Sequence, residues 1–378
     1  MAPPEQHARV ARPSRGACAG RAGRGARIGR AALLLALLGA GSACGVDRDE
    51  FVRFFPTYGF RSAPQEWTLN VHGWIYEPEG RELLVLSLVD LLDLEDELEV
   101  RDRVFAERAG LFLVDNERAE RLRIRVAGRV HDLPLSTPDG HFQGRIRVAG
   151  SELAAHGDPA AAVAFHAVTR RNDPRAFAGV VRLIGPEGVS VVSDIDDTIR
   201  VADVSDREEL LKNTFIRPYR AVEGMADLFR RWAEAGDVAF HYVSGSPWQL
   251  AGVIEQFLAD EAFPPGSLHL RRFRLAEAPT VRAMLEAPVE SKRAALETLL
   301  ADFPRRRFVF VGDSSEQDPE LYGALARAHP EQLEMILIRE IPGRESGADR
   351  YRKAFEGVPA ARWGVFGAPA GVTYVPAR

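Results

Sequence analysis

The sequence predicts an α/β protein, in which a parallel sheet with helices on both faces follows a mainly antiparallel β domain. From about residue 186, short apolar runs alternate with amphipathic helical patterns, an order typical of a parallel sheet. Between residues 50 and 185, apolar and polar residues instead alternate with a period of two, which is typical of antiparallel strands with one solvated face. We therefore expect a β-rich domain over residues 50–185, an α/β domain over 186–345, and a C-terminal extension of that second domain over 346–378.

The N-terminal residues predict an export signal. The first 30 residues contain seven Arg, and the apolar run "AALLLALLGAGSAC" that follows is too short to span a bilayer and ends in small residues. We expect a signal over residues 1–43 and lipidation of Cys44, as in bacterial lipoproteins of the cell envelope. Plain cleavage after Ala43 and a start codon assigned too far upstream are the alternatives. Cys18 is the only other cysteine, so we expect no internal disulfide after cleavage.

The β-rich region contains three clear alternating segments and one helical pattern. The alternating segments cover residues 67–80, 121–136 and 141–150, and the helical pattern is "RELLVLSLVDLLDLEDEL" over 81–98. The histidines of this region lie singly along the chain, which is typical of structural residues. We therefore predict no reactive site there.

The α/β region begins with the buried strand "VSVVSDID" over 189–196. A helix is expected over 222–236, because apolar residues recur at helical spacing and Gly236 closes the segment. A second strand covers 238–246, and Ser246 and Pro247 suit the N-cap and first position of the next helix. A helix that starts near Val289, a strand before Asp313, a helix with Asp318 as N-cap, and a strand over 333–341 complete the series.

Polar residues stand at the carboxyl ends of three of these strands. Asp194 and Asp196 follow the first, Ser244 and Gly245 follow the second, and Asp313 follows the third, with Asp318 five residues later. In parallel sheets, ligands bind at this edge. Carboxylates are the ligands that Mg²⁺ prefers, together with water and substrate phosphate, and a hydroxyl and backbone amide before a helix suit a phosphate. The sequence therefore predicts a Mg²⁺ site beside a phosphate site.

Lys292 is singled out by composition. The chain has 49 basic residues but only three Lys, so Arg supplies most positive charges. A compact ammonium can approach a phosphoryl oxygen and a carboxylate together, a task for which Arg is a poor substitute. We therefore expect a specific role for Lys292.

These motifs resemble, in order, the four motifs of the haloacid dehalogenase superfamily: Asp-x-Asp-x-Thr over 194–198, Ser244, Lys292 and Gly-Asp-Ser-x-x-x-Asp over 312–318. Longer stretches, including "LLKNTFIRPY", "HYVSGSPWQL" and "FPPGSLHLRRF", resemble the catalytic domain of the actin-patch type of phosphatidate phosphatase. The resemblance covers about residues 186–345. It implies a haloacid dehalogenase-like fold and a phosphatase.

The resemblance also implies roles for the site residues. Asp194 would form an aspartyl-phosphate, and Asp196 would protonate the leaving alkoxide and then deprotonate water. Mg²⁺ would be held by Asp194, the backbone carbonyl of Asp196 and Asp313. Asp318 would support metal-bound water or Lys292. The groups implied at the substrate phosphate are Thr198, Ser244, the amide of Gly245, and Lys292.

Several alternatives remain open at this stage. The substrate implied is phosphatidate at a membrane surface, but a soluble phosphomonoester would need the same residues. A non-catalytic lipid-binding or scaffold protein is disfavoured because Asp194 and Lys292 are both present. The run Arg271, Arg272 and Arg274 suits an anionic headgroup or an exposed strand equally well. We assign Asp197 a structural role, and the net charge of −5 gives no indication of a nucleic acid partner.

Overall fold

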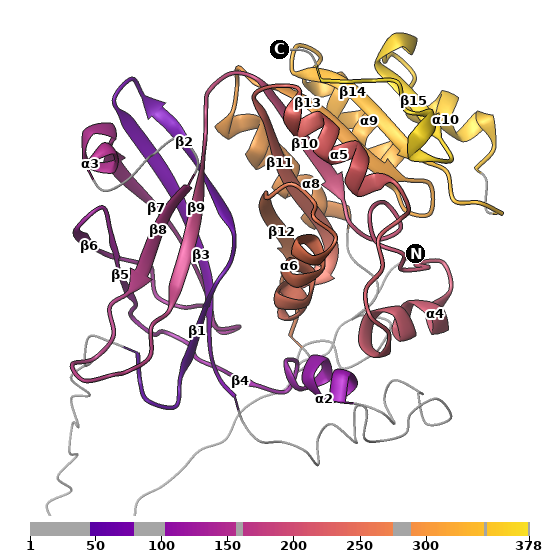
Figure 1. The fold of residues 1–378 in the computed structure, drawn as a ribbon. Coiled ribbons are helices and arrows are strands. Elements are labelled where there is room, and N and C mark those ends of the chain that lie inside the picture. Colours follow the sequence, from indigo (N-terminus) through magenta and orange to yellow (C-terminus); the bar gives the residue numbers. More distant parts are fainter. Residues whose placement is uncertain (1–45, 79–102, 156–161, 275–288, 344–345, 377–378) are drawn as a thin grey trace, which may run out of the picture. The chain divides into compact units, whose positions relative to one another are not determined.

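The computed structural model describes residues 46–78, 103–155, 162–274, 289–343 and 346–376 (Figure 1). The predicted signal over 1–43, Cys44 and the predicted helix over 81–98 lie outside these residues. The described residues form two sheets, one in the N-terminal half and one in the C-terminal half.

The first sheet is mainly antiparallel, in agreement with the alternating sequence pattern. In β7, Phe142, Ile146 and Val148 are buried while Arg145 and Arg147 are exposed, so the two faces differ as the period of two requires. The exception is the parallel pair formed by β2 and β9. The strands are β1 (Phe51–Phe54), β2 (Thr57–Ala63), β3 (Glu66–Glu77), β4 (Asp115–Asn116), β5 (Arg123–Val126), β6 (Arg129–Asp132), β7 (His141–Ala149), β8 (Ala162–Ala167) and β9 (Ala178–Ile184), with helices α2 (Arg103–Gly110) and α3 (Gly150–Ala154).

The second sheet is parallel throughout, which confirms the sequence prediction. Its spatial order is β12-β11-β10-β13-β14-β15, so the first strand of the region lies in the middle. The chain adds β11 and β12 on one side of β10 and then crosses to the other side, and in such sheets the binding crevice lies where the order reverses. The strands are β10 (Val189–Asp194), β11 (Val238–Pro247), β12 (Ser267–Arg271), β13 (Arg307–Asp313), β14 (Leu333–Arg339) and β15 (Trp363–Phe366).

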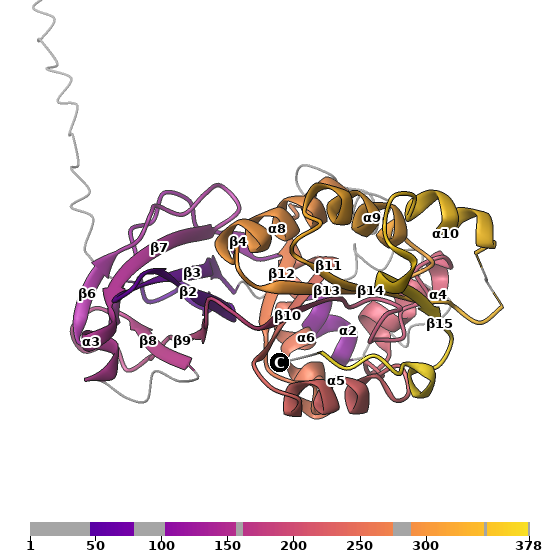
Figure 2. The same cartoon turned by 90° about the horizontal axis from the view of Figure 1, so that it is seen from above.

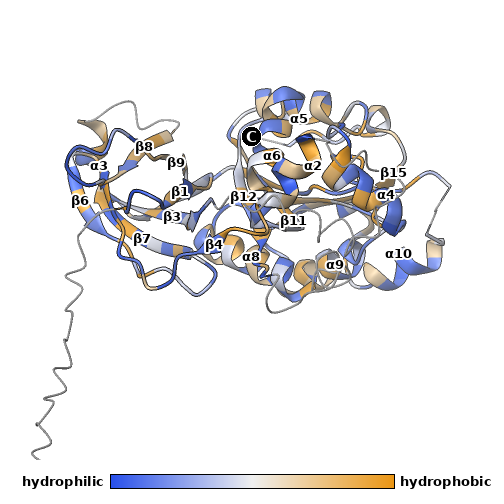
Figure 3. Cartoon of the chain, turned by 90° about the horizontal axis from the view of Figure 1, so that it is seen from below, coloured by the Kyte–Doolittle hydropathy of each residue, from blue (hydrophilic) through white to orange (hydrophobic). Residues whose placement is uncertain are grey.

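Helices cover both faces of the parallel sheet, as predicted. Figure 2 shows α8, α9 and α10 on one face and α5 and α6 on the other. Figure 3 shows that these helices mix hydrophobic and hydrophilic residues, as expected for helices with one buried side. The helical segments are α4 (Arg207–Leu211), η1 (Lys212–Ile216), α5 (Met225–Glu234), η2 (Trp248–Leu250), α6 (Ala251–Asp260), α8 (Val289–Asp302), α9 (Asp318–Ala328), α10 (Ala348–Ala354), η3 (Ala360–Arg362) and η4 (Pro369–Gly371).

The central strand β10 is buried on both faces. Val191 packs into the core under α5 and α6, and its neighbour Val192 packs into the core under α8 and α9. Full burial of a side chain of this size stabilises the fold by about 1.5–3 kcal/mol. A strand held on both faces gives the polar residue at its end a rigid position.

Two predicted helix caps are wrong. The helix after β11 begins as a 3₁₀ turn at Trp248, and the Ser246 side chain does not cap it. Helix α9 has Gln317 at its N-cap, and Asp318 is its first residue. Both side chains instead contact charged partners across the site, and hydrogen bonds to charged groups are stronger than those to a backbone amide.

Candidate active site

Asp194 is the last residue of β10 and is almost completely buried, at 1% exposure. The chain then turns tightly, because the amides of Ile199 and Arg200 both donate to the carbonyl of Ile195. Asp197 has φ +58° within this turn. Its carboxylate accepts hydrogen bonds from three successive backbone amides, those of residues 202, 203 and 204. The predicted structural role of Asp197 is therefore confirmed.

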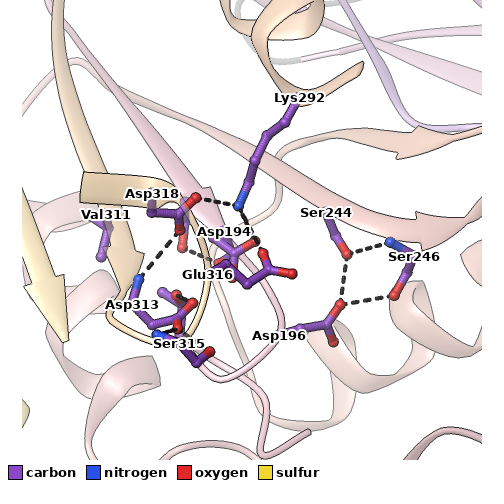
Figure 4. Close-up of polar contacts among 12 residues, drawn as sticks. Asp194, Asp196, Ser244, Ser246, Lys292, Val311, Asp313, Ser315, Glu316 and Asp318 are labelled. Atoms are coloured by element: carbon purple, nitrogen blue, oxygen red, sulfur yellow. Dashed lines mark hydrogen bonds and ion pairs between the residues drawn. The ribbon is translucent and has the colours of Figure 1, made fainter. Parts of the chain in front are cut away.

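A cluster of charged residues surrounds Asp194, and we call it the Lys292 cluster. It consists of Lys292, Asp194, Asp313, Glu316 and Asp318 (Figure 4). Lys292 Nζ, from α8, lies 2.8 Å from Asp194 Oδ1, 2.5 Å from Asp318 Oδ1 and 3.4 Å from Glu316 Oε2. One carboxylate oxygen each of Asp194, Asp313 and Asp318 lies within 4.8 Å of the others. The fold thus gathers residues from α8, from the end of β10, and from the end of β13, the loop after it and the start of α9.

The Lys292 cluster carries an excess of negative charge. Four carboxylates face one ammonium, which leaves three negative charges uncompensated when all are ionised. Burial, followed by Asp318 and Glu316, raises the pKa of Asp313 to about 7. Burial also raises the pKa of Asp194 well above its ordinary value, against the opposing effect of Lys292. Although burial alone would lower the pKa of Lys292, Asp194 and Asp318 raise it well above its ordinary value.

The residues of this cluster fit a divalent cation. Asp194 Oδ2 is buried without a hydrogen-bond donor, and Oδ1 has Lys292 close by but no hydrogen bond of good geometry. Asp313 is oriented by Ser315, whose amide donates to its Oδ1 at 2.6 Å. Buried carboxylates with free lone pairs and excess negative charge are the donor set that Mg²⁺ takes. Asp194 and Asp313 would hold it, with Asp318 within reach.

The loop after β13 depends on a glycine. A Cβ at Gly312 would lie 2.7 Å from the Cβ of Asp318, closer than folded proteins allow. Arg350 of α10 fastens the same loop by donating to the carbonyl oxygens of Ser314 and Glu316. The C-terminal helix therefore positions the segment that carries Asp313 and Glu316.

A second group of polar residues, the Asp196 cluster, consists of Asp196, Arg200, Ser244 and Ser246 and is held apart from the first (Figure 4). Arg200 Nε donates to Asp196 Oδ1 at 2.8 Å, and Arg200 is only 1% exposed. The hydroxyls of Ser244 and Ser246 donate to Asp196 Oδ2 at 2.8 and 2.9 Å. The guanidinium also stacks on Tyr219 at 4.1 Å.

These contacts keep Asp196 ionised. Burial alone would raise its pKa, but Arg200 and then the two serine hydroxyls hold the pKa of Asp196 below its ordinary value. The carboxylate has no contact with Lys292 among the interactions of the described residues. The two aspartates of the Asp-x-Asp motif therefore have different environments: one faces an excess of negative charge and the other is neutralised.

The remaining predicted site residues lie beside these clusters. Thr198 is buried, and its hydroxyl faces Asp313 Oδ2 at 3.4 Å, so the structure places it beside a carboxylate. Gly245 follows Ser244 at the end of β11, and its carbonyl accepts from Arg271 Nε at 3.0 Å. Arg271 is buried at the end of β12, which excludes the interpretation of all three arginines as an exposed strand. Substrate contacts of these residues stay predictions.

Sequence reasoning missed three residues of the site: Arg200, Ser246 and Glu316. Arg200 lies four residues after Asp196, a spacing that allows an ion pair within one turn of the chain. The sequence therefore contained a signal for this pair. Ser246 was assigned to a helix cap, which its position before Pro247 also suited. Glu316 lies inside the Gly-Asp-Ser segment, but nothing in the sequence alone shows that it turns toward Lys292.

Comparison with known proteins gives a family for the α/β region. Residues 189–340 match the family described as phosphatidate phosphatase APP1, catalytic domain. This segment belongs to that family. The APP1-type domain is similar to phosphatidate phosphatase APP1 of Saccharomyces cerevisiae, at 32% identity over 170 residues, and to an uncharacterized protein of Schizosaccharomyces pombe, at 30% over 171 residues.

The aligned region is 44% of this chain but only 28% and 27% of the two relatives. The chain thus matches somewhat more than a quarter of their length. One solved structure, whose title concerns the active site of a carbohydrate esterase, is 11% identical to this chain. The alignment covers 81% of this chain and 94% of that chain, and its TM-score of 0.20 is too low to indicate a shared fold.

The prediction of an exported bacterial lipoprotein is wrong on this comparison. Both relatives of the APP1-type domain are yeast proteins, so the relatives do not point to a bacterial cell envelope or to lipidation of Cys44. In the ranges that the structure describes, no helix is both long enough and apolar enough to cross a membrane.

Proposed function

We propose that this chain is a Mg²⁺-dependent phosphatase that hydrolyses phosphatidate to diacylglycerol through an aspartyl-phosphate on Asp194. The observation that carries the proposal is the buried carboxylate of Asp194, with one oxygen free of donors and the other 2.8 Å from Lys292, in an APP1-type domain. A carboxylate without hydrogen bonds is available to attack phosphorus and to bind a cation.

The two clusters divide the chemistry between them. In the first step, Asp194 attacks phosphorus, the bond to the substrate oxygen breaks, and the departing alkoxide takes a proton from Asp196. In the second step, Asp196 removes a proton from water, which attacks the aspartyl-phosphate and releases inorganic phosphate. When bound, Mg²⁺ would neutralise charge between the attacking carboxylate and the phosphoryl group. An ionised Asp196 can act directly as the base of the second step. To act as the acid of the first step, Asp196 must take up a proton before the alkoxide departs.

Lys292 and the end of β11 would hold the phosphoryl group. The ammonium of Lys292 lies 2.8 Å from Asp194 Oδ1, so it would lie beside the phosphorus that Asp194 attacks. Ser244 contributes its hydroxyl, although Asp196 occupies that hydroxyl at 2.8 Å here. The amide of Gly245 is a further donor. Thr198 is the fourth group proposed for substrate binding.

The pocket beside Asp196 is small, with a volume of about 40 Å³, so it admits a few waters but no acyl chain. It is lined by Asp196, Val204, Leu210, Thr214, Phe215, Gly245, Ser246, Pro247, Leu250 and Glu316. The preference for a lipid substrate rests instead on the similarity of this domain to phosphatidate phosphatase APP1. We therefore place phosphatidate first and a soluble phosphomonoester second, and we propose that the protein works at a membrane surface.

We further propose a haloacid dehalogenase-like fold for residues 186–345, with 346–378 as its C-terminal extension and 50–185 as a β-rich N-terminal domain. The strand order supports this proposal, because the motif residues lie at the ends of three adjacent strands, β11, β10 and β13. Arg350 supports the assignment of the extension, since it fastens the Asp313 loop.

The function is tested by assaying the purified full-length chain on phosphatidate in mixed micelles and on a panel of soluble phosphomonoesters, with Mg²⁺ or with EDTA. We expect hydrolysis only with Mg²⁺, a higher kcat/KM on phosphatidate, and none in Asp194→Asn. Asp196→Asn should lower phosphatidate turnover by about 10²–10⁴ and should let phosphorylated Asp194 accumulate. The exposed Glu234→Gln serves as the control for loss of one negative charge.

Activity in EDTA equal to that with Mg²⁺ would contradict the proposed dependence on Mg²⁺. Full activity in Asp194→Asn would contradict the proposed role of Asp194 as the nucleophile. Hydrolysis of soluble phosphomonoesters alone would favour the second substrate class, and no hydrolysis of any phosphomonoester would favour a non-catalytic lipid-binding or scaffold protein.

A further inference from the structure

A large cavity lies outside the active site, where the edge strand β12 and helix α8 meet β2, β3 and β7. Its volume is about 750 Å³, within the range of sites that bind small molecules. Direct contacts connect the two sides: Leu268 N donates to the carbonyl of Pro56 at 3.0 Å, and Tyr58 donates to Asp302 at 2.7 Å. The cavity therefore lies at a junction where hydrogen bonds join the segments of the two sheets.

The charged residues that line the cavity are all positive. Arg145, Arg271 and Arg272 contribute to its wall, and no carboxylate does so among the described residues. This is unexpected in a chain with 54 acidic and 49 basic residues. Arg145 pairs with Asp302 at 2.8 Å, and Arg272 lies 3.8 Å from Asp139, but neither carboxylate lines the cavity. Cationic groups in a hollow attract an anion.

The rest of the wall is apolar or neutral. The apolar lining consists of Val71, Trp248, Leu268, Leu270, Ala294 and Ala295. Asn70 adds an amide nitrogen that is buried without a hydrogen-bond partner, and an unsatisfied buried donor favours a ligand that supplies an acceptor. Burial lowers the pKa of His269 to about 4, so this lining residue is neutral at physiological pH. A small inorganic anion would leave the apolar wall uncovered.

The cavity and the active site share two structural elements. On α8, Ser291, Ala294 and Thr298 line the cavity, while Lys292, one residue from Ser291, turns to Asp194. Arg271 lines the cavity and also donates to the carbonyl of Gly245 at 3.0 Å. A ligand in the cavity would therefore touch residues that position the phosphoryl-binding groups.

We propose that this cavity is a second binding site, distinct from the phosphoryl site, for an anionic amphiphile that carries a carboxylate or phosphate headgroup on one apolar chain. The headgroup lies between Arg145 and Arg272, and the chain lies against Leu268, Leu270 and Trp248. The site does not require that the chain be a phosphatase, because none of its residues belongs to the Lys292 or the Asp196 cluster.

The test is equilibrium binding of a fluorescent stearate, 12-(9-anthroyloxy)stearate, to the full chain in EDTA and below the micelle concentration. We expect saturable binding at one site per chain. Stearate and hexadecyl phosphate should displace the probe, and the one that acts at lower concentration identifies the headgroup. Hexadecanol and inorganic phosphate should displace it at least about tenfold less well, since each lacks one of the two recognised parts.

Matched variants locate the site. Arg145→Gln combined with Arg272→Gln should weaken binding by about tenfold or more. The control Arg147→Gln should not weaken binding, although it removes one positive charge from β7, the strand that carries Arg145, at a position 77% exposed and outside the cavity. Ala294→Leu fills the cavity without changing its charge and should weaken binding to a similar extent. Thermal unfolding and far-UV circular dichroism report whether each variant is folded.

Three results would overturn the proposal: no saturable binding of the probe, equal binding by folded Arg145→Gln/Arg272→Gln and Arg147→Gln variants, or displacement by hexadecanol as effective as by stearate. Because the readout is binding in EDTA, failure here is distinguishable from failure of the phosphatase proposal.

Discussion

The buried carboxylates around Lys292 should make the metal-free protein less stable as the pH rises from about 4 to 7. The perturbation that isolates this effect is Asp313→Asn, which removes one buried negative charge while keeping a side chain of the same shape. Although Asp313 is a predicted Mg²⁺ ligand, we expect Asp313→Asn to raise the stability of the metal-free protein at neutral pH.

The magnitude follows from the pKa of Asp313, which burial, Asp318 and Glu316 raise from 3.8 to about 7. A raised pKa means that the folded state holds the proton more tightly than the unfolded chain. The contribution to stability is therefore fully present below pH 3.8 and is lost as the pH rises to about 7. At about 1.4 kcal/mol per pKa unit, the loss is at most about 4 kcal/mol. At an unfolding entropy of about 2.1 cal/mol/K per residue, that corresponds to roughly 5 °C in the unfolding midpoint of a chain of 378 residues.

The assay is thermal unfolding in EDTA between pH 4 and 8 for the wild type, Asp313→Asn and the surface control Glu234→Gln. The wild type and the control should lose stability over this range, and Asp313→Asn should lose up to about 4 kcal/mol less. Other buried carboxylates, such as Glu50 with a pKa raised by burial to about 7, titrate in the same range. The difference between curves, rather than one curve, therefore measures Asp313.

Adding Mg²⁺ at pH 7.5 should reverse the order, because a ligand that binds only the folded state stabilises it. The wild type should gain stability and Asp313→Asn should gain little. The reasoning is refuted if Asp313→Asn in EDTA shows the same pH slope as the wild type, or if Mg²⁺ stabilises both proteins equally.

Four further substitutions test the clusters. Arg200→Gln leaves Asp196 buried without its cation and should destabilise the fold by about 3–5 kcal/mol in denaturant unfolding, and combining it with Asp196→Asn should cost less than the sum of the single changes. Lys292→Arg should lower kcat on any phosphomonoester by about 10² or more, with unchanged circular dichroism, because a planar guanidinium cannot occupy the space of an ammonium within 3.4 Å of three carboxylates. Ser246→Ala should lower kcat on phosphatidate by about tenfold and on p-nitrophenyl phosphate by less, with Ser246→Thr restoring part of it. Arg350→Ala should raise the Mg²⁺ concentration needed for half-maximal activity several-fold, with little change in kcat at saturation, because it frees the Asp313 loop; an unchanged Mg²⁺ dependence would count against that positioning role.

The sequence by itself determined the layered architecture. Period-two alternation before residue 185 and strand–helix alternation after it follow from which faces are buried, and local patterns report this directly. It also determined which strand ends carry polar residues, since Asp194, Ser244 and Asp313 each end an apolar run and parallel strands align such ends.

Only the tertiary structure decided which polar residues face one another. Asp194 and Asp196 are two residues apart and chemically identical, yet one lies beside Lys292 and the other beside Arg200. Ser246 and Asp318 fit helix caps by local rules, but charged partners from distant segments bind them more strongly. The cavity beyond β12 has no signal in the sequence at all, because its arginines come from strands 126 residues apart, at Arg145 and Arg271, that only folding brings together. Burial sets the energy of each charge, and burial is a property of the whole fold.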